Sequence, residues 1–207
     1  MAGKVIKGSE IATIDVVLVT VKPEVEDPNT VDELVLDTSN QIQTTIATET
    51  TEKVTLIIKG RLIAQKPEEV TVTGNTIVLT DNVFNPELVK ILQGGVIEYE
   101  EDGKTFKKYT PPVSGDKAEK VPFTLKAYSA IYGADALIHG YECISYPHCQ
   151  GVPIAFGSQD GVFRVQEYTI NSAPATGEAP YVIERVKELP KVSVDAIPED
   201  DMLDDEE

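Results

Sequence analysis

The segment of residues 70–95, which reads VTVTGNTIVLTDNVFNPELVKILQGG, constrains the fold more than any other part of the chain. In its first half, a hairpin closed at Gly74-Asn75 would place four apolar side chains on one face and Thr71, Thr73 and Thr76 on the other. Glycine at the first position of a two-residue loop suits a type II′ turn, so the pattern predicts a tight hairpin. The predicted cross-strand pairs are Val72 with Ile77 and Val70 with Leu79.

The second half of the segment predicts a short helix with a signal at each end. Asn85 offers a side-chain oxygen to cap the first turn, and Pro86 fits the first helical position, where no backbone N–H is needed. The apolar residues of one helical face are Leu88, Ile91 and Leu92. Gly94-Gly95 ends the helix, and a helix with one apolar face covers one face of a sheet.

The remaining sequence is typical of β-strands divided by turn residues. The expected strands are residues 14–21, 41–51, 53–60, 96–99, 121–128, 136–146, 163–170 and 181–186. Residues 53–60 alternate apolar and polar side chains, which predicts a half-buried strand, whereas residues 41–51 are rich in threonine. The expected loops are residues 24–33 and 110–120, and residues 147–151 are expected to form a turn.

Regular short strands with Gly and Pro between them favour a sandwich or barrel. The predicted fold class is therefore mainly β, with two packed antiparallel sheets and one flanking α-helix. We expect one domain over residues 1–190 and an acidic extension over residues 191–207. In that extension eight acidic residues accompany the single base Lys191, so we expect a mobile segment.

The charge of the chain argues against attraction to nucleic acid. Eighteen basic residues stand against 35 acidic residues, which gives a formal net charge of −17. Binding of a phosphate backbone depends on Lys and Arg that displace counterions. Residues 1–12 lack the apolar core of a signal peptide, and the longest apolar stretch, residues 16–21, is too short to span a bilayer. We expect a soluble protein that is cytosolic when synthesised.

Motifs of common catalytic sites are missing from the sequence. It contains no glycine-rich phosphate loop with lysine, no G-x-S-x-G and no H-E-x-x-H. Carboxylates for glycoside hydrolysis are plentiful, but the chain has no Trp for sugar stacking. We therefore expect no catalytic residues, no cofactor and no enzymatic activity.

The four residues with side chains that zinc prefers are His139, Cys143, His148 and Cys149. Adjacent His148 and Cys149 would diverge on a strand, and the spacing lacks a C-x2–4-C knuckle. We therefore expect no metal and interpret Cys143 as a core thiol on a strand. A disulfide between the two cysteines is not expected in a cytosolic chain.

A series of local features follows one another in a characteristic order between about residues 11 and 190. They are Lys59-Gly60, the Gly74-Asn75 hairpin, the NPELVKILQGG helix, the Tyr109-Thr110-Pro111-Pro112 loop, the Pro122-Phe123 strand, a hairpin over residues 140–151, Gly161-Val162-Phe163 and Leu189-Pro190. This order resembles the major tail tube proteins of tailed bacteriophages. The resemblance rests on the pattern of elements and not on a single motif.

The resemblance implies hexameric rings whose inner sheets join into a continuous barrel, and a tube made of stacked rings. A protruding loop and the terminal arms would connect one ring to the next. The expected stacking loop consists of Thr48, Glu49, Thr50, Thr51, Glu52 and Lys53. The alternatives are an ordinary exposed hairpin at these residues and a strand of the tube lumen over residues 41–51.

The function implied is that of a structural subunit of the virion tail, assembled in the host cytoplasm. Its acidic lumen would conduct DNA without binding it, because like charges repel. Expected partners are further copies of the chain, a tape-measure protein, tail-initiation or baseplate proteins, a tail terminator and, in a contractile tail, a sheath; no membrane is expected. Two alternatives remain: a tube subunit of a phage-like bacteriocin or contractile secretion particle, and a β-sandwich binding module or enzyme.

Overall fold

The computed structural model describes residues 11–25, 33–102, 104–115 and 120–191, which form twelve strands and one helix. In chain order the elements are β1 (Thr13–Pro23), β2 (Leu34–Leu36), β3 (Ser39–Thr51), β4 (Val54–Ile58), β5 (Arg61–Lys66), β6 (Glu69–Asp81), α1 (Pro86–Gln93), β7 (Val96–Tyr99), β8 (Phe106–Thr110), β9 (Phe123–Tyr132), β10 (Ile138–Gly151), β11 (Gln166–Ser172) and β12 (Val182–Val186). The predicted fold class is confirmed: the protein is mainly β, antiparallel and sandwich-like.

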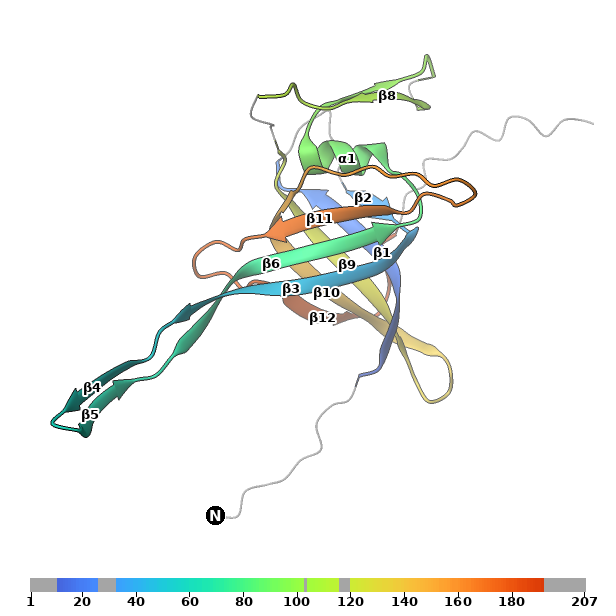
Figure 1. Ribbon diagram of the computed structural model, residues 1–207. Coiled ribbons are helices and arrows are strands. Elements are labelled where there is room, and N and C mark those ends of the chain that lie inside the picture. Colours follow the sequence, from blue (N-terminus) through green and yellow to red (C-terminus); the bar gives the residue numbers. More distant parts are fainter. Residues whose placement is uncertain (1–10, 26–32, 103, 116–119, 192–207) are drawn as a thin grey trace, which may run out of the picture.

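Strand β10 belongs to both layers of the sandwich. Along one edge it pairs with β9, and along the other its residues 141–145 pair with β12 while residues 149–151 pair with β11. Its register with β9 shifts between Tyr146 and Cys149, where His148 has a φ of 48°. Such a bulge bends a strand and increases its twist. One layer is thus β2-β1-β9-β10-β12, and the other is β10-β11-β6-β3, which crosses in front of it in Figure 1.

The main core lies between the two layers and under the helix. Alternate residues of each strand point inward, as the period of two in a strand requires. The fully buried residues of this core include Val19, Val21, Ile77, Leu79, Phe123, Leu125, Tyr168 and Ile170. A smaller buried cluster of Leu18, Tyr128 and Cys143 forms separately, with Leu189 packed against it.

The predicted helix is confirmed together with both of its ends. The backbone N–H of Leu88 donates to the Asn85 side chain over 2.9 Å, and Pro86 occupies the first turn. Gly94 ends the helix with a φ of 78° and donates to the carbonyl of Lys90. The helix lies above β11 in Figure 1 and buries Leu92 completely.

The hairpin predicted at Gly74-Asn75 is wrong, because β6 runs without a turn from Glu69 to Asp81. A Cβ atom on Gly74 would lie 2.4 Å from the carbonyl oxygen of Ser172, so glycine is needed for close approach of the two backbones. The pairing of β6 with β3 also shifts register beside Gly74, between Ala47 and Thr48. Asn75 is buried and donates from its side chain to the Pro180 carbonyl.

Two further expectations are corrected. Residues 53–60 contain a strand, β4, but it is exposed and not half-buried. The expected hairpin over residues 140–151, with its turn at residues 147–151, is a single bulged strand, β10. Most of the acidic extension, residues 192–207, lies outside the described residues, as do residues 26–32 and 116–119 of the two expected loops.

Candidate functional site

The most exposed element of the protein is a long β arm that leaves the sandwich. Strands β3 and β6 keep pairing beyond the body, from Thr48 opposite Val72 to Thr51 opposite Glu69. Strands β4 and β5 then form a two-stranded hairpin, which turns at Lys59 and Gly60 with φ values of 51° and 77°. We call residues 48–72 the arm; every one of them is exposed, and Figure 1 shows the arm projecting to the lower left.

The arm carries large aliphatic side chains that no second layer of the described residues covers. They are Val54, Leu56, Ile57, Ile58, Leu62, Ile63, Val70 and Val72, and all but Val72 are at least half exposed. An isolated two-stranded hairpin is marginally stable in water, and contiguous exposed apolar surface in a soluble protein marks an interaction site. The arm is therefore the leading candidate surface for assembly.

The outer part of the arm, residues 53–66, differs in charge from the rest of the chain. Residues 53–66 contain Lys53, Lys59, Arg61 and Lys66 and no acidic residue. All 35 acidic residues of the chain lie elsewhere, with the 14 remaining basic residues. An apolar arm with a basic tip thus extends from an acidic body.

The structure places the six residues expected to form a stacking loop at the base of the arm. Thr48, Glu49, Thr50 and Thr51 belong to β3, and Glu52 and Lys53 connect β3 to β4. The Thr51 hydroxyl accepts a hydrogen bond from the backbone N–H of Glu69 and so ties the two sides of this stem. The tip was missed, although Lys59-Gly60 between two aliphatic runs is a recognisable hairpin signal.

The layer that carries the arm has a polar outer face with little charge. Its outward residues form three cross-strand rows: Gln41, Thr80 and Glu167; Gln43, Val78 and Thr169; and Thr45, Thr76 and Asn171. Glu167 is the only charged residue in these rows. Strand β3 borders this face and, among the described strands, pairs on one side only. Its other backbone edge is unpaired, although its residues 40–42 lie beside β1 across a cavity.

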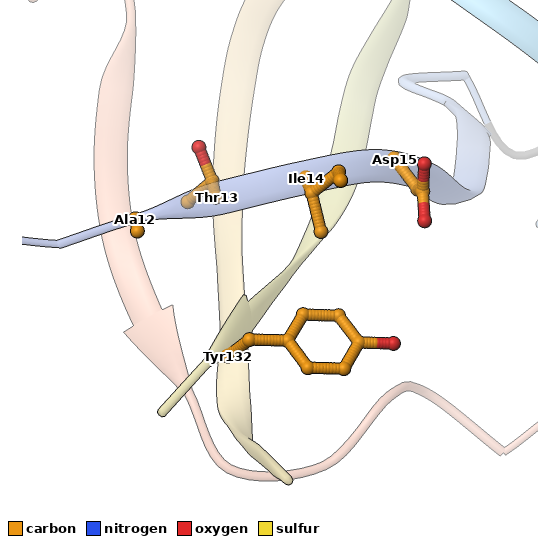
Figure 2. A pocket seen from close by; sticks show the side chains of 5 residues that line it. All are labelled: Ala12, Thr13, Ile14, Asp15 and Tyr132. Carbon is orange, nitrogen blue, oxygen red and sulfur yellow. The ribbon is translucent and has the colours of Figure 1, made fainter. Parts of the chain in front are cut away.

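A cleft lies where the first residues of β1 pass the end of β9. It has a volume of about 470 Å³ and is lined mainly by apolar atoms of Ala12, Thr13, Ile14, Asp15 and Tyr132. Figure 2 shows the Ile14 side chain pointing toward the Tyr132 ring, with the Asp15 carboxylate on the same strand. Asp15 has a φ of 61° and lies within the register shift between Ile14 and Leu18, where the ladder between β1 and β9 is interrupted.

The four zinc-type residues do not converge on one point. Cys149 belongs to the main core and Cys143 to the smaller cluster, and both thiols are free. His139 contacts Asp135 over 2.8 Å, and His148 lies between two other carboxylates. Within the described part of the chain, no group of three or more His, Cys, Asp or Glu residues is arranged to hold a metal ion.

His148 links three segments of the chain. Its Nδ1 lies 2.7 Å from Glu24, which follows β1, and its Nε2 lies 3.0 Å from Glu178, which precedes β12. Since ionised carboxylates only accept hydrogen bonds, the imidazole donates from both nitrogens in its charged form. Hydrogen bonding to Glu24, with a smaller effect of Glu178, raises the pKa of His148. Partial burial raises the pKa of Glu24, but hydrogen bonds from His148 and Thr124 outweigh this effect and lower it.

Replacing His148 with Asn is expected to make the free energy of unfolding less dependent on pH. A raised folded pKa stabilises the protein below the unfolded value of 6.5, and this effect is lost as the pH rises through the folded pKa. The lowered pKa of Glu24 stabilises the folded protein above pH 4.5, and this stabilisation is lost as the pH falls through the folded pKa. The difference between wild type and His148→Asn should thus be largest between about pH 4.5 and 6.5.

Denaturant unfolding at pH 5.5 and pH 9 measures this difference. Asparagine tolerates a positive φ, and any backbone strain it adds appears equally at both pH values. An equal difference at the two pH values would show that the two ion pairs do not stabilise the fold.

Comparison with known proteins gives no match: no family model fits the sequence, and no curated protein is similar to it. The helix among the described residues is too short to cross a membrane. The arm, the unpaired strand edge and the polar outer face are the features of the described residues that bear on function.

Proposed function

We propose that this chain is the structural subunit of a phage tail tube and assembles into stacked hexameric rings. The observation that carries the proposal is the arm, an exposed apolar hairpin that projects from a two-layer β body. Exposed aliphatic residues on both strands of a hairpin favour burial against another chain. In an assembly of identical copies, a neighbouring subunit supplies the surface against which the arm is buried.

The open edge of β3 supports ring formation. An unpaired edge strand is a template for pairing with another chain, and natural proteins protect it or use it in a closed assembly. Closed rings of identical copies satisfy such edges without leaving a free end. The rings we propose would join the arm-bearing layers of neighbouring copies through this edge.

The outer face of the same layer suits the lumen of a tube that passes DNA. Its three outward rows contain one acidic residue and no basic residue. A duplex would meet no cationic side chain that could form an ion pair with its phosphates and release counterions, so this face would bind it only weakly. The lumen so formed would be nearly neutral, whereas the resemblance led us to expect an acidic one. In this arrangement the stem residues 48–53 lie where the arm leaves the lumen wall and reaches toward the next ring.

The resemblance of the sequence to tail tube proteins supports this function, but fewer of its features are present in the structure than expected. The hairpins at Gly74-Asn75 and residues 140–151 are strands, whereas the capped helix has the expected form. The proposed partners are those of a tail tube: further copies of this chain, a tape-measure protein, initiation or baseplate proteins, a terminator and, in a contractile tail, a sheath. A tube subunit of a bacteriocin or secretion particle would use the same surfaces.

Negative-stain electron microscopy and sedimentation of the concentrated, purified chain test the proposal. We expect hollow tubes built from six-fold rings, with the assembled fraction increasing with concentration. A chain that stays monomeric even with its tape-measure and tail-initiation partners present would contradict it.

A further inference from the structure

The connection between β11 and β12, residues 173–181, lies against the root of the arm. We use root for residues 73–75, where β6 leaves the body: its pairing with β11 ends at Asn75 opposite Ser172, and beyond this point it pairs, among the described strands, with β3 alone. The Asn75 side chain donates to the Pro180 carbonyl over 2.8 Å. In Figure 1 the connection that follows the arrowhead of β11 turns beside this root. The position of the connection therefore helps to set the direction in which β6 enters the arm.

His148 attaches the same connection to the body at a second point. Its Nε2 lies 3.0 Å from the carboxylate of Glu178, which belongs to the connection, and its Nδ1 lies 2.7 Å from Glu24, which follows β1. The backbone of β10 beside the ring is held separately, because the Pro147 carbonyl accepts a hydrogen bond from the Ser172 hydroxyl over 2.7 Å. The imidazole is thus a bridge between a fixed strand and a connection at the surface.

The charge of this ring depends on two neighbouring groups. Among the described residues, the charged groups that contact the His148 imidazole are Glu24 and Glu178. The next residue, Cys149, is buried, and burial raises the pKa of its thiol to about 12, so the thiol stays neutral where the imidazole titrates. The surroundings of the ring therefore favour its charged form.

The two glutamates depend differently on that charge. Glu24 also accepts the backbone N–H of His148 over 3.0 Å and the Thr124 hydroxyl over 3.1 Å. The Glu178 side chain has no second hydrogen bond within the described part of the chain. A neutral imidazole donates from one nitrogen only. If the shorter bond to Glu24 keeps the proton on Nδ1, loss of the other proton leaves a lone pair of Nε2 facing the Glu178 carboxylate.

We propose that His148 is a pH-sensitive latch, which holds residues 173–181 at the root of the arm when it is charged and releases them when it is neutral. The latch opens as the pH rises through the folded pKa of His148, which its carboxylate partners raise from 6.5. Residues 175–179 are all exposed, so little buried surface retains them once the bond to Glu178 is lost. The latch belongs to the single chain and does not depend on the proposed assembly.

Amide hydrogen exchange of the full-length monomer, measured by NMR between about pH 6 and pH 8.5, tests the latch. The backbone N–H of Glu178 donates to the Ala175 carbonyl over 3.0 Å and reports on the closed connection. Its protection factor, in which the pH dependence of chemical exchange is removed, should fall about two- to fivefold as the pH rises, the range expected for an ion pair at the surface. The midpoint should coincide with the titration of the His148 ring protons.

Glu178→Gln should abolish this pH dependence. A glutamine side chain accepts from the charged imidazole and donates to the neutral one, so it bonds Nε2 in both states. The matched control is His139→Asn, which removes the other histidine of the chain and its contact with Asp135 over 2.8 Å. This control should keep the wild-type pH profile of residues 175–179.

The signal of the Asn75 side-chain amide reports whether the release reaches the root of the arm. It should change with the same midpoint, because this amide bonds the Pro180 carbonyl of the connection. A Glu178 protection factor that is independent of pH overturns the latch, and so does an equal pH dependence in Glu178→Gln. If the connection loosens while the Asn75 signal stays constant, the latch does not act at the root and the proposal is wrong.

Discussion

Replacing Leu92 with alanine is expected to lower the free energy of unfolding by about 2–5 kcal/mol. Leu92 is fully buried in the main core, on the face of α1 that contacts β10. The close contact of Gly151 with Leu92 involves the Cα, Cβ and carbonyl oxygen of Leu92, which alanine keeps, so the variant removes only the buried Cγ and Cδ atoms. The cost within this range depends on how far the surrounding core relaxes into the cavity.

Leu62→Ala is the matched control, since it removes the same atoms from a side chain that is 58% exposed on the arm. At concentrations where the chain is monomeric, it should change the free energy of unfolding by less than about 0.5 kcal/mol. Urea unfolding followed by circular dichroism measures both variants. Similar losses for the two leucines would mean that the helix does not cover the core as described.

The helix was predictable because each of its signals is local. The Asn85 cap, Pro86 and the Gly94 end act within one turn of the residues they stabilise, and the apolar stripe follows from the helical period. The same holds for the short strand at residues 96–99, which is β7. Where the determinants lie within a few residues, sequence and structure agree.

Gly74 shows why other elements were not predictable. Alternating residues before and after it fit a hairpin and a continuous strand equally well, and Gly-Asn is a turn signal in the first case. The reason for glycine is the backbone of Ser172, which is distant in sequence. Strand β10 is a similar case, because its bend follows from a change of partner from β12 to β11.

The exposure of the arm was not predictable for a different reason. Its alternating pattern predicts a strand with one buried face, and the strand exists, but no layer within the described part of the chain covers that face. Hydrophobic periodicity reports that a side chain favours burial and does not identify the chain that buries it. The expected stacking residues 48–53 lie at the stem of the arm, and residues 59–60 at its tip were not among them.

Replacing four aliphatic residues of the arm with threonine is expected to raise the concentration needed for assembly by about 10²–10⁴-fold. Those residues are Leu56, Ile57, Leu62 and Ile63, which are 51–62% exposed. Burial of a whole aliphatic side chain contributes about 1.5–3 kcal/mol, so about half of that is available at each site and roughly 3–6 kcal/mol in total. Each 1.4 kcal/mol changes an association constant about tenfold.

Threonine keeps the β-propensity of the arm, so the hairpin and the body should stay folded and the monomer should unfold at nearly the wild-type denaturant concentration. The matched control removes four exposed valines of the body by the same change: Val83, Val96, Val113 and Val162. Light scattering across a concentration series should show assembly of the control near the wild-type concentration and a large shift for the arm variant. If both variants assemble like wild type, the arm is not the assembly surface, because its apolar residues would then stay exposed to water in the assembled state as they are in the free chain.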